Sequence, residues 1–316
     1  MMNNQIYLGM DLGGTNIKVG ICDEHGSLVK TFEGPTGAEH GPEAVMQRIA
    51  DYARKIVADS PYEWEQVAGI GAGLAGFLDI PEGIVKFSPN LRWDNVPVKK
   101  LLENDLGKAV RIDNDANVAA LGEAISGAGA DVLDLVCYTL GTGVGGGIIM
   151  DGRIYQGHNG MAGELGHISV VPDIEAIVCG CGQVGCLETV SSATGIIRMA
   201  GDAVERGDMT SLALLPKIEA KDVFDAAREG DDVASRIVNR AAYYLGRSMA
   251  TLAVTLNPKR FIIGGGVSKA GDILFNPIRE TFAKYTPAPS REGVDIIPAV
   301  LGNDAGVVGA ACLNLR

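Results

Sequence analysis

One local pattern occurs twice in the chain, once near its beginning and once near its middle. In each copy an apolar strand, Ile6–Leu12 in the first and Leu135–Leu140 in the second, breaks at glycine and threonine and returns as another strand. The residues at the two breaks are Gly13, Gly14 and Thr15 in the first copy and Gly141, Thr142 and Gly143 in the second. A supersecondary unit used twice predicts two related halves that face each other across a cleft.

Both breaks suit phosphate oxygens. Glycine leaves the backbone N–H groups at a hairpin tip exposed, and rows of such groups form concave anion sites. In the first copy the Thr15 hydroxyl and the Lys18 ammonium lie close to the turn and add further donors. A glycine turn is common in any β-hairpin, but its duplication favours a phosphate site at both tips.

A dense set of metal ligands lies between residues 163 and 188. His167 precedes Cys179, Cys181 and Cys186, and thiolates with a neutral imidazole are the ligands that zinc prefers. Four protein ligands leave no open position for water, so the pattern predicts a structural zinc site. The alternative is three ordinary thiols in a buried loop, but ligand-type residues spaced so closely among glycines favour the metal.

Two further groups of residues indicate ligand binding. Glu164 and Glu188 bracket the predicted metal loop without being needed as ligands. A loop that fixes two acids in place indicates the wall of a binding site. Farther along, an apolar strand expected at residues 261–263 ends in a run of bare glycines, at which a flat ligand can approach the backbone closely. These glycines are Gly264, Gly265 and Gly266.

Polar residues follow another expected strand, at residues 110–112. Asp113, Asn114, Asp115 and Asn117 lie between this strand and a helix expected from residue 118, at the end of the strand where α/β sheets carry their chemistry. A helix N-cap would account for one acid, but not for two acids and two amides. Asp113 and Asp115 are both candidate bases, since alternate strand residues point to the same side.

Charge and cysteine content limit the class of protein. The 316 residues include 27 basic and 39 acidic side chains, a net charge of −12, which disfavours nucleic acid and anionic membranes as partners. The sequence has no long uninterrupted apolar run and no amino-terminal signal pattern. Six cysteines are too few and too clustered for a disulfide framework, so we expect a reducing cytoplasm.

Five elements occur in a fixed order along the chain: Asp11-x-Gly-Gly-Thr-x-x-Lys18, Asn114-Asp115-Ala-Asn117, Leu140-Gly-Thr-Gly-x-Gly-Gly-Gly147, the cysteine loop, and Gly264-Gly-Gly266. This order, from about residue 6 to residue 311, resembles the ROK family of the actin-like sugar kinase superfamily. It looks closest to that family's bacterial ATP-dependent glucokinases. Glu164-x-x-His167 with Cys179-x-Cys181-Gly-x-x-Gly-Cys186-x-Glu188 is the most specific part of the resemblance, whereas the Asp-x-Gly-Gly-Thr motif belongs to the wider superfamily.

The resemblance implies an α/β protein with a duplicated, actin-like (ribonuclease H-like) ATPase fold. Two domains would lie around a central cleft, and the large one would carry the structural zinc loop. We expect a small domain formed by residues 1–118 with residues 301–316, and a large domain formed by residues 119–300. The implied activity is phosphorylation of glucose by ATP to give glucose 6-phosphate, in a homodimer or homotetramer.

The resemblance also implies a role for each candidate residue. Asp115 would be the general base that takes the proton from the sugar 6-hydroxyl, because the Asn-Asp-Ala-Asn register selects it over Asp113. Asp11 resembles the acid that holds Mg²⁺ through water. The sugar hydroxyls would be held by Asn114, Glu164, His167 and Glu188, with Asn90 and the Gly76 backbone as additions. The ATP phosphates would be held by Gly13, Gly14, Thr15, Lys18, Gly141, Thr142 and Gly143, and the adenosine by Gly264, Gly265 and Gly266. His167 would serve both the zinc and the sugar, one ring nitrogen to each.

Several related functions share these motifs. Within the kinases, the alternatives are phosphorylation of fructose, mannose or N-acetylmannosamine, and a glucomannokinase that uses polyphosphate. A sugar-sensing repressor is the alternative from another class, but it would carry an amino-terminal helix-turn-helix segment, for which we expect no room before Ile6. A structural filament protein would have no use for the metal loop or for Glu188.

Overall fold

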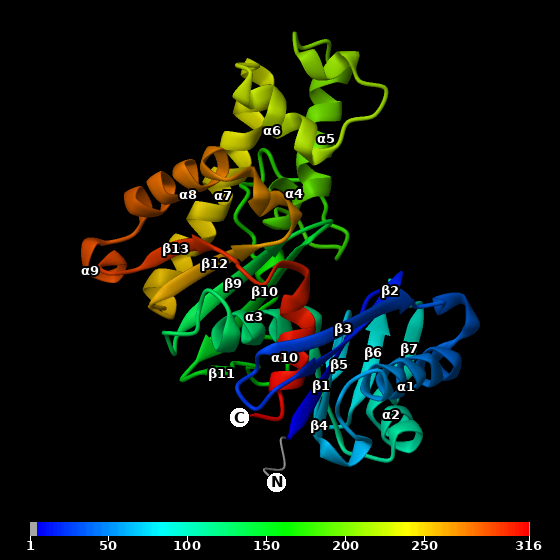
Figure 1. Ribbon diagram of the computed structural model, residues 1–316. Coiled ribbons are helices and arrows are strands. Elements are labelled where there is room, and N and C mark those ends of the chain that lie inside the picture. Colours follow the sequence, from blue (N-terminus) through cyan, green and yellow to red (C-terminus); the bar gives the residue numbers. More distant parts are fainter. Residues whose placement is uncertain (1–4, 316) are drawn as a thin grey trace. The chain divides into compact units, whose positions relative to one another are not determined.

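The computed structural model describes residues 5–315, which form two compact units (Figure 1). The first unit consists of the chain up to Leu133, the segment Gly147–Gly163 and the chain from Val300 onward. The second unit consists of Asp134–Gly146 and Glu164–Ala299. The domains expected from the sequence differ from these units at residues 119–133, at residues 147–163 and at residue 300. A boundary at residue 118 would fall inside one helix, Asp115–Ser126. The expected division into functional domains remains a prediction.

A five-stranded sheet with the order β3-β2-β1-β4-β8 forms the centre of the first unit. Strands β1 and β2 form the predicted antiparallel hairpin, while β1, β4 and β8 run parallel to one another. The strands of a small antiparallel sheet, β5-β6-β7, come between β4 and β8 in the sequence. The strands are β1 (Ile6–Leu12), β2 (Asn16–Cys22), β3 (Leu28–Pro35), β4 (Val67–Leu74), β5 (Phe77–Asp79), β6 (Ile84–Ser88), β7 (Trp93–Val96) and β8 (Val110–Asn114).

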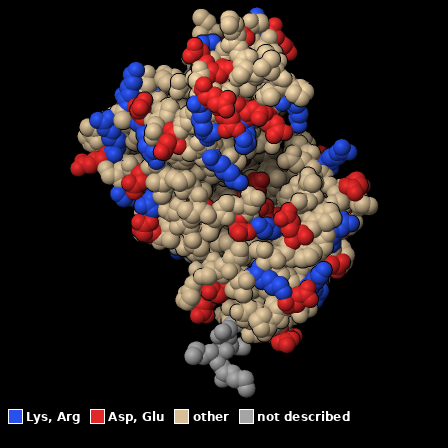
Figure 2. All heavy atoms as spheres, turned by 45° about the horizontal axis from the view of Figure 1, so that its top comes forward, with Lys and Arg blue, Asp and Glu red and all other residues tan. Residues whose placement is uncertain are grey.

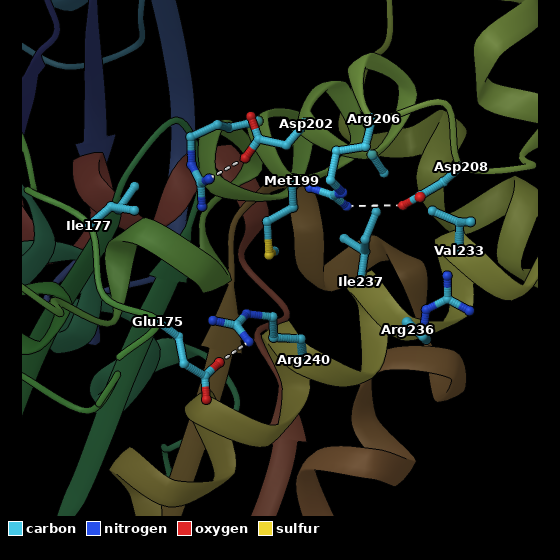
Figure 3. A pocket seen from close by; sticks show the side chains of 12 residues that line it. Glu175, Ile177, Met199, Asp202, Arg206, Asp208, Val233, Arg236, Ile237 and Arg240 are labelled. Atoms are coloured by element: carbon cyan, nitrogen blue, oxygen red, sulfur yellow. Dashed lines mark hydrogen bonds and ion pairs between the residues drawn. The ribbon is translucent and has the colours of Figure 1, made fainter. Parts of the chain in front are cut away.

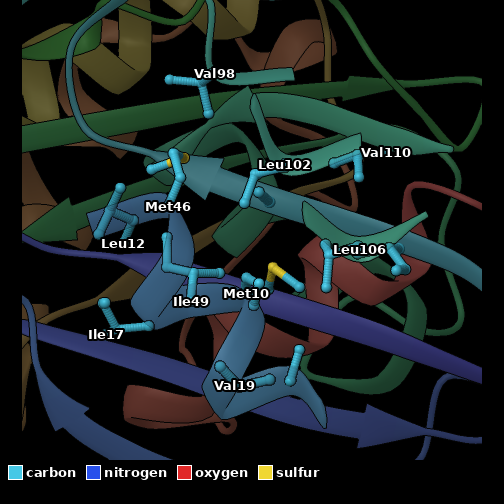
Figure 4. Close-up of a cluster of buried hydrophobic side chains, with 14 of the residues drawn as sticks. Met10, Leu12, Ile17, Val19, Met46, Ile49, Val98, Leu102, Leu106 and Val110 are labelled. Carbon is cyan, nitrogen blue, oxygen red and sulfur yellow. The ribbon is translucent and has the colours of Figure 1, made fainter. Parts of the chain in front are cut away.

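Four helices complete the first unit. They are α1 (Pro42–Ala58), α2 (Val98–Leu106), α3 (Asp115–Ser126) and α10 (Ala305–Cys312). Figure 4 shows α1 and α2 facing the sheet through Met46, Ile49 and Leu102, which pack against Met10 and Val19 of the strands. All of these side chains are completely buried, so this apolar layer holds the first hairpin to the helices behind it.

Helix α10 packs on the sheet at glycine positions of β1 and β4. A Cβ atom at Gly9 would overlap the carbonyl oxygen of Val307, and one at Gly71 would overlap that of Ala310. Glycine in the middle of β1 and β4 therefore permits a backbone-to-backbone approach that no larger residue allows.

A second sheet has the order β11-β10-β9-β12-β13. Strand β12 pairs in parallel with both β9 and β13, and β10 forms an antiparallel hairpin with β11. Its strands are β9 (Leu135–Leu140), β10 (Val144–Met150), β11 (Arg153–Ile154), β12 (Arg260–Gly264) and β13 (Asp295–Pro298). The helices of the second unit are α4 (Glu188–Ser191), α5 (Ala193–Glu205), α6 (Ala220–Arg228), α7 (Asp232–Thr255), α8 (Asp272–Tyr285) and α9 (Ala288–Arg291).

Helix α7 follows its sequence pattern closely. The Asp231 side chain caps the helix by accepting hydrogen bonds from the backbone N–H groups of Val233 and Ala234. Apolar residues recur at three- and four-residue spacing along this helix, which predicts a core-facing stripe. The stripe is buried along its whole length: Val233, Ile237, Ala241, Leu245, Met249 and Leu252. The interpretation of this stripe as core is confirmed.

Two local predictions are wrong. The apolar residues 299–301 predict a short strand after Pro298, but they are irregular. Strand β13 ends at Pro298, and the Val300 and Leu301 N–H groups donate to the Glu123 carboxylate. Residues 113–117 do not form a loop, because β8 runs through Asn114 and α3 starts at Asp115. In both places a side-chain acceptor satisfies the backbone donors that a further strand or turn would have satisfied.

Acidic and basic side chains alternate over the face displayed in Figure 2. On that face, the acidic side chains are not gathered into a single patch. Among residues 5–315, no helix combines the length and the apolar character needed to cross a membrane.

Candidate active site

Thr36 holds the tip of the first glycine hairpin through two hydrogen bonds. The Thr36 hydroxyl donates to the Gly13 carbonyl at 2.7 Å, and its backbone N–H donates to the Thr15 carbonyl at 2.8 Å. Gly14 lies against Asn90, since a Cβ at Gly14 would stand 3.0 Å from the Asn90 carbonyl oxygen. The hairpin tip is therefore fixed, and it lies beside one of the predicted sugar-binding residues. Thr36 was not anticipated, because its role depends on contacts rather than on any motif.

Asp11 and Lys18 are cross-strand neighbours on β1 and β2. The Lys18 ammonium forms an ion pair with Asp304 and also donates to the Asn303 carbonyl at 3.2 Å. Asp304 ends a short 3₁₀ turn, Gly302–Asp304, at the start of α10. The predicted phosphate-binding lysine is thus held in place by a carboxylate from the far end of the chain.

Burial raises the pKa of Asp11 to about 6, and the negative charge of Asp115 adds to this effect while Lys18 opposes it. Asp11 also lies against Gly306, where a Cβ would stand 2.5 Å from its Oδ2 atom. Two carboxylates that repel each other at the end of a sheet provide an environment in which a divalent cation is favourable. Asp11 and Asp115 therefore suit a divalent cation such as the predicted Mg²⁺.

Asp113 and Asp115 have different surroundings. Asp113 is 1 % exposed, and its carboxylate accepts hydrogen bonds from Asn117 Nδ2 at 2.9 Å and from Gln156 Nε2 at 2.6 Å. Burial raises the pKa of Asp113, although these hydrogen bonds oppose the rise. Asp115 is half-buried at the first position of α3, where one carboxylate oxygen accepts from the Ala116 N–H group at 2.9 Å. Of the two acids, Asp115 has the greater access to a substrate.

Asn114 both caps α3 and reaches a neighbouring loop. Its side-chain oxygen accepts from the backbone N–H groups of Ala116 and Asn117, so the N-cap interpretation is correct for this residue. Its Nδ2 atom lies 3.5 Å from the Gly76 carbonyl oxygen. The first unit therefore places two further predicted sugar-binding groups, Asn114 and Gly76, next to each other.

The four predicted metal ligands converge in the second unit. The ligand atoms of His167, Cys179, Cys181 and Cys186 all lie within 4.8 Å of one another. The sulfur atoms of Cys181 and Cys186 are 3.7 Å apart, and Cys179 Sγ is 3.8 Å from His167 Nδ1. Zinc–sulfur bonds of about 2.3 Å at tetrahedral angles place two sulfurs about 3.8 Å apart. The donor set and its spacing thus fit a tetrahedral zinc ion.

The carboxylates of Glu164 and Glu188 lie beside the four candidate metal ligands, as the sequence predicts. Glu188 starts α4, and its Oε2 atom accepts from the Val144 N–H group at 2.9 Å. Glu164 Oε2 lies 3.8 Å from His167 Nε2, the ring nitrogen that does not face Cys179. Burial raises the pKa of Glu164, with an opposing contribution from His167 and an additional one from Glu188. The two glutamates and His167 therefore form one cluster of polar groups beside the metal ligands.

The second glycine turn borders a cavity of about 530 Å³. Gly141 and Thr142 line it on one side and Gly266 on another, together with residues of α6 and of the 3₁₀ turn that follows β12. Gly265 does not line the cavity, but its φ of 83° and its contact with the Leu140 carbonyl admit only glycine. The sequence missed the remaining lining residues: Ala193, Glu219, Ala220, Lys221, Phe224, Asp225, Arg228, Val267, Lys269 and Ala270.

Comparisons with known proteins identify the family of the chain. The model of the ROK family matches residues 7–316. The chain belongs to the ROK family. Within this family it is 44 % identical to the glucokinase of Halalkalibacterium halodurans, over 99 % of this chain and 96 % of that one. It is 40 % identical to the glucokinase of Thermotoga maritima, over 97 % of this chain and 96 % of that one.

Solved structures of the ROK family share the fold. The ROK family glucokinase from Streptomyces griseus, in complex with glucose and AMPPNP, has a TM-score of 0.79 and is 37 % identical over 98 % of each chain. This similarity confirms the predicted α/β sugar kinase fold.

Proposed function

We propose that the chain is an ATP-dependent glucokinase, which transfers the γ-phosphoryl group of ATP to the 6-hydroxyl of glucose. The observation that carries this proposal is identity of 37–44 % with glucokinases over nearly the whole length of the chain. The products are glucose 6-phosphate and ADP.

Asp115 is the proposed general base. It would accept the proton of the sugar 6-hydroxyl as the oxygen attacks the γ-phosphorus. Phosphoryl transfer requires mainly positioning and charge stabilisation, so one correctly placed carboxylate is sufficient. The hydrogen bonds that occupy both oxygens of Asp113 support Asp115 over its neighbour.

Recognition of the sugar is assigned to six groups. Asn114, Asn90 and the Gly76 backbone in the first unit, and Glu164, His167 and Glu188 in the second, would bond the hydroxyl groups. Carboxylate and amide oxygens accept hydrogen bonds from a polyol in fixed directions. His167 would bind zinc through Nδ1, which faces Cys179, and the sugar through Nε2.

The nucleotide is assigned to the two glycine hairpins. Thr15, Lys18 and the backbone of Gly13 and Gly14 would bind phosphate oxygens, as would Gly141, Thr142 and Gly143. The adenosine would lie in the cavity that Gly266 lines, on the backbone that Gly264 and Gly265 shape. Mg²⁺, held through water by Asp11, would neutralise phosphate charge.

Zinc is proposed to be structural, bound by His167, Cys179, Cys181 and Cys186, because four protein ligands leave no position for a reactive water. We also propose a cytoplasmic location and a homodimer or homotetramer.

Identification of the product tests the function. The protein is incubated with Mg-ATP and glucose, and the products are followed by ³¹P nuclear magnetic resonance. We expect ADP and glucose 6-phosphate to form in equal amounts. ADP without a sugar phosphate, or a phosphate on another glucose hydroxyl, would contradict the proposal.

A further inference from the structure

A second cavity lies in the second unit, between α5 and α7, where the glucokinase proposal assigns no role (Figure 3). Its volume is about 320 Å³, which is at the small end of the range for pockets that bind small molecules. Four arginines line it, and we call it the arginine cavity: Arg198, Arg206, Arg236 and Arg240.

The arginine cavity has an excess of positive charge in an acidic protein. Three carboxylates also line it, each paired with one arginine. These pairs are Arg198–Asp202, Arg206–Asp208 and Arg240–Glu175. Arg236 is exposed and has no hydrogen bond or ion pair within the part of the chain that the structure describes. Four guanidinium groups against three carboxylates thus leave a local positive charge in a chain whose net charge is −12.

The inner wall of the arginine cavity is apolar. Met199 and Ala203 of α5 and Val233 and Ile237 of α7 line it, and all four side chains are buried. Figure 3 shows Met199 and Ile237 between the charged groups of the two helices. A bare inorganic anion would leave this wall without a contact, whereas a ligand with a carbon skeleton and an anionic group would use both parts.

Two arginines connect the cavity with the proposed sugar-binding cluster of the same unit. Arg240 pairs with Glu175, which precedes the metal ligand Cys179 by four residues. Arg198 donates to the Thr189 carbonyl at 3.2 Å, and Thr189 follows Glu188. A ligand that draws these guanidinium groups toward itself would therefore act on the loop and the helix that carry the sugar-binding residues.

We propose that the arginine cavity binds a small organic phosphate monoester, and that binding changes the affinity for sugar. A guanidinium fork donates two parallel hydrogen bonds to phosphate oxygens, a geometry that a lysine cluster does not offer. The existing ion pairs are partly exposed and each contributes little to stability, so a doubly charged phosphate can compete with their carboxylates. The effect on sugar affinity rests on the proposed glucokinase function, but the binding itself does not.

Calorimetry and thermal unfolding with glycerol 3-phosphate test the binding, with glycerol and inorganic phosphate as reference probes at equal ionic strength. Saturating Mg-ADP keeps the probes out of the nucleotide site. We expect saturable binding of glycerol 3-phosphate to the wild type, weaker binding of inorganic phosphate, and none of glycerol. Arg236→Ala should weaken binding at least tenfold without loss of the fold, because the side chain is exposed. Arg247→Ala is the matched control, since Arg247 lies on the same helix outside the cavity.

Three results would overturn the site: no saturable binding to the wild type, wild-type binding by Arg236→Ala, or equal losses in Arg236→Ala and Arg247→Ala. Inorganic phosphate that binds as tightly as glycerol 3-phosphate would overturn the assignment to an organic ligand. A change of mass in sedimentation caused by Arg236→Ala would show that the cavity belongs to an interface between copies of the chain, and would also contradict the site.

A kinetic measurement tests the effect on sugar. Saturating glycerol 3-phosphate should change the KM for glucose at least threefold in the wild type and leave it unchanged in Arg236→Ala. Binding without any change in KM would overturn the regulatory part alone. Absence of all sugar turnover would contradict the glucokinase proposal and leave the binding result in force, so the two failures are distinguishable.

Discussion

Asp113 and Asp115 stand two residues apart, and the structure places them in different environments. Asp113 is enclosed, with Asn117 and Gln156 as hydrogen-bond donors, whereas Asp115 lies half-buried at the start of α3. A proton acceptor needs access to its substrate, and a buried acid with satisfied oxygens serves the fold. At the scale of single residues, the proposed chemistry therefore rests on Asp115.

Asparagine substitutions separate the two roles. Asp115→Asn should lower kcat with glucose by a factor of about 10²–10⁴ and leave the melting temperature within about 2 °C. Asp113→Asn should destabilise the protein by about 1–3 kcal/mol, because its new amide would face the donors Asn117 and Gln156. Steady-state kinetics and thermal unfolding measure both effects. Normal turnover by Asp115→Asn would refute its assignment as the base.

Asp11 makes stability depend on pH. Its pKa in the folded protein, about 6, is above the ordinary value of 3.8, so its contribution to stability is fully present below about pH 4 and is lost as the pH rises through 6. Asp11→Asn should therefore raise the free energy of unfolding relative to the wild type at pH 8, by at most about 3 kcal/mol, and have little effect at pH 4. Urea unfolding at the two pH values measures the difference. An equal effect at both would contradict this explanation.

At the scale of elements, the sequence predicted features with a local pattern but not contacts between residues far apart in the chain. The burial of the α7 stripe and the convergence of the four candidate metal ligands were predicted correctly, because their signals lie within one helix or one loop. The irregular residues Val300 and Leu301 are held by Glu123, 177 and 178 residues earlier in the chain. The partner of Lys18, Asp304, lies 286 residues away from it. Such pairings leave no periodic pattern in the sequence, so the structure was needed to find them.

The same reasoning explains why the α6 residues of the nucleotide cavity were missed. Lys221, Phe224 and Arg228 belong to an amphipathic helix without a recognisable motif. Their relation to Gly141 and Gly266 arises only from tertiary packing. By contrast, the glycines themselves were predicted, because a strand that ends in glycine is visible in the sequence.

The contact of α10 with the sheet can be tested at Gly71. Gly71→Ala should lower the free energy of unfolding by about 1–3 kcal/mol or more, since its Cβ would overlap the Ala310 carbonyl oxygen. Gly201→Ala in α5 is the control, because a Cβ there would have no atom within 4 Å. It should stabilise the protein by about 0.5–1 kcal/mol. Similar melting temperatures for the two variants would contradict the close packing of α10.

The metal loop should support stability and sugar binding together. Cys181→Ala removes one of four ligands, so we expect less than one zinc per chain, a lower melting temperature and a higher KM for glucose. Atomic absorption, thermal unfolding and kinetics measure these quantities. Cys137→Ala, at a buried thiol outside the loop, is the control for the loss of a cysteine. A zinc-free variant with wild-type melting temperature and KM would be incompatible with a structural metal.

At the scale of the whole molecule, the chain combines a ROK family fold with a strongly acidic composition. The match to the family covers residues 7–316, and the glucokinases of Halalkalibacterium halodurans and Thermotoga maritima match it over nearly their full lengths. A net charge of −12 offers little attraction to a polyanion. These properties together favour ATP as the phosphoryl donor and a hexose as the acceptor.

An assay with a panel of sugars and two phosphoryl donors tests whether the protein is an ATP-dependent glucokinase. ADP release is measured with Mg-ATP and, in turn, glucose, mannose, fructose and N-acetylmannosamine, and with polyphosphate in place of ATP. We expect kcat/KM with ATP to be at least about a hundredfold higher for glucose than for any other sugar. A higher kcat/KM for another sugar, or turnover only with polyphosphate, would contradict the assignment as an ATP-dependent glucokinase.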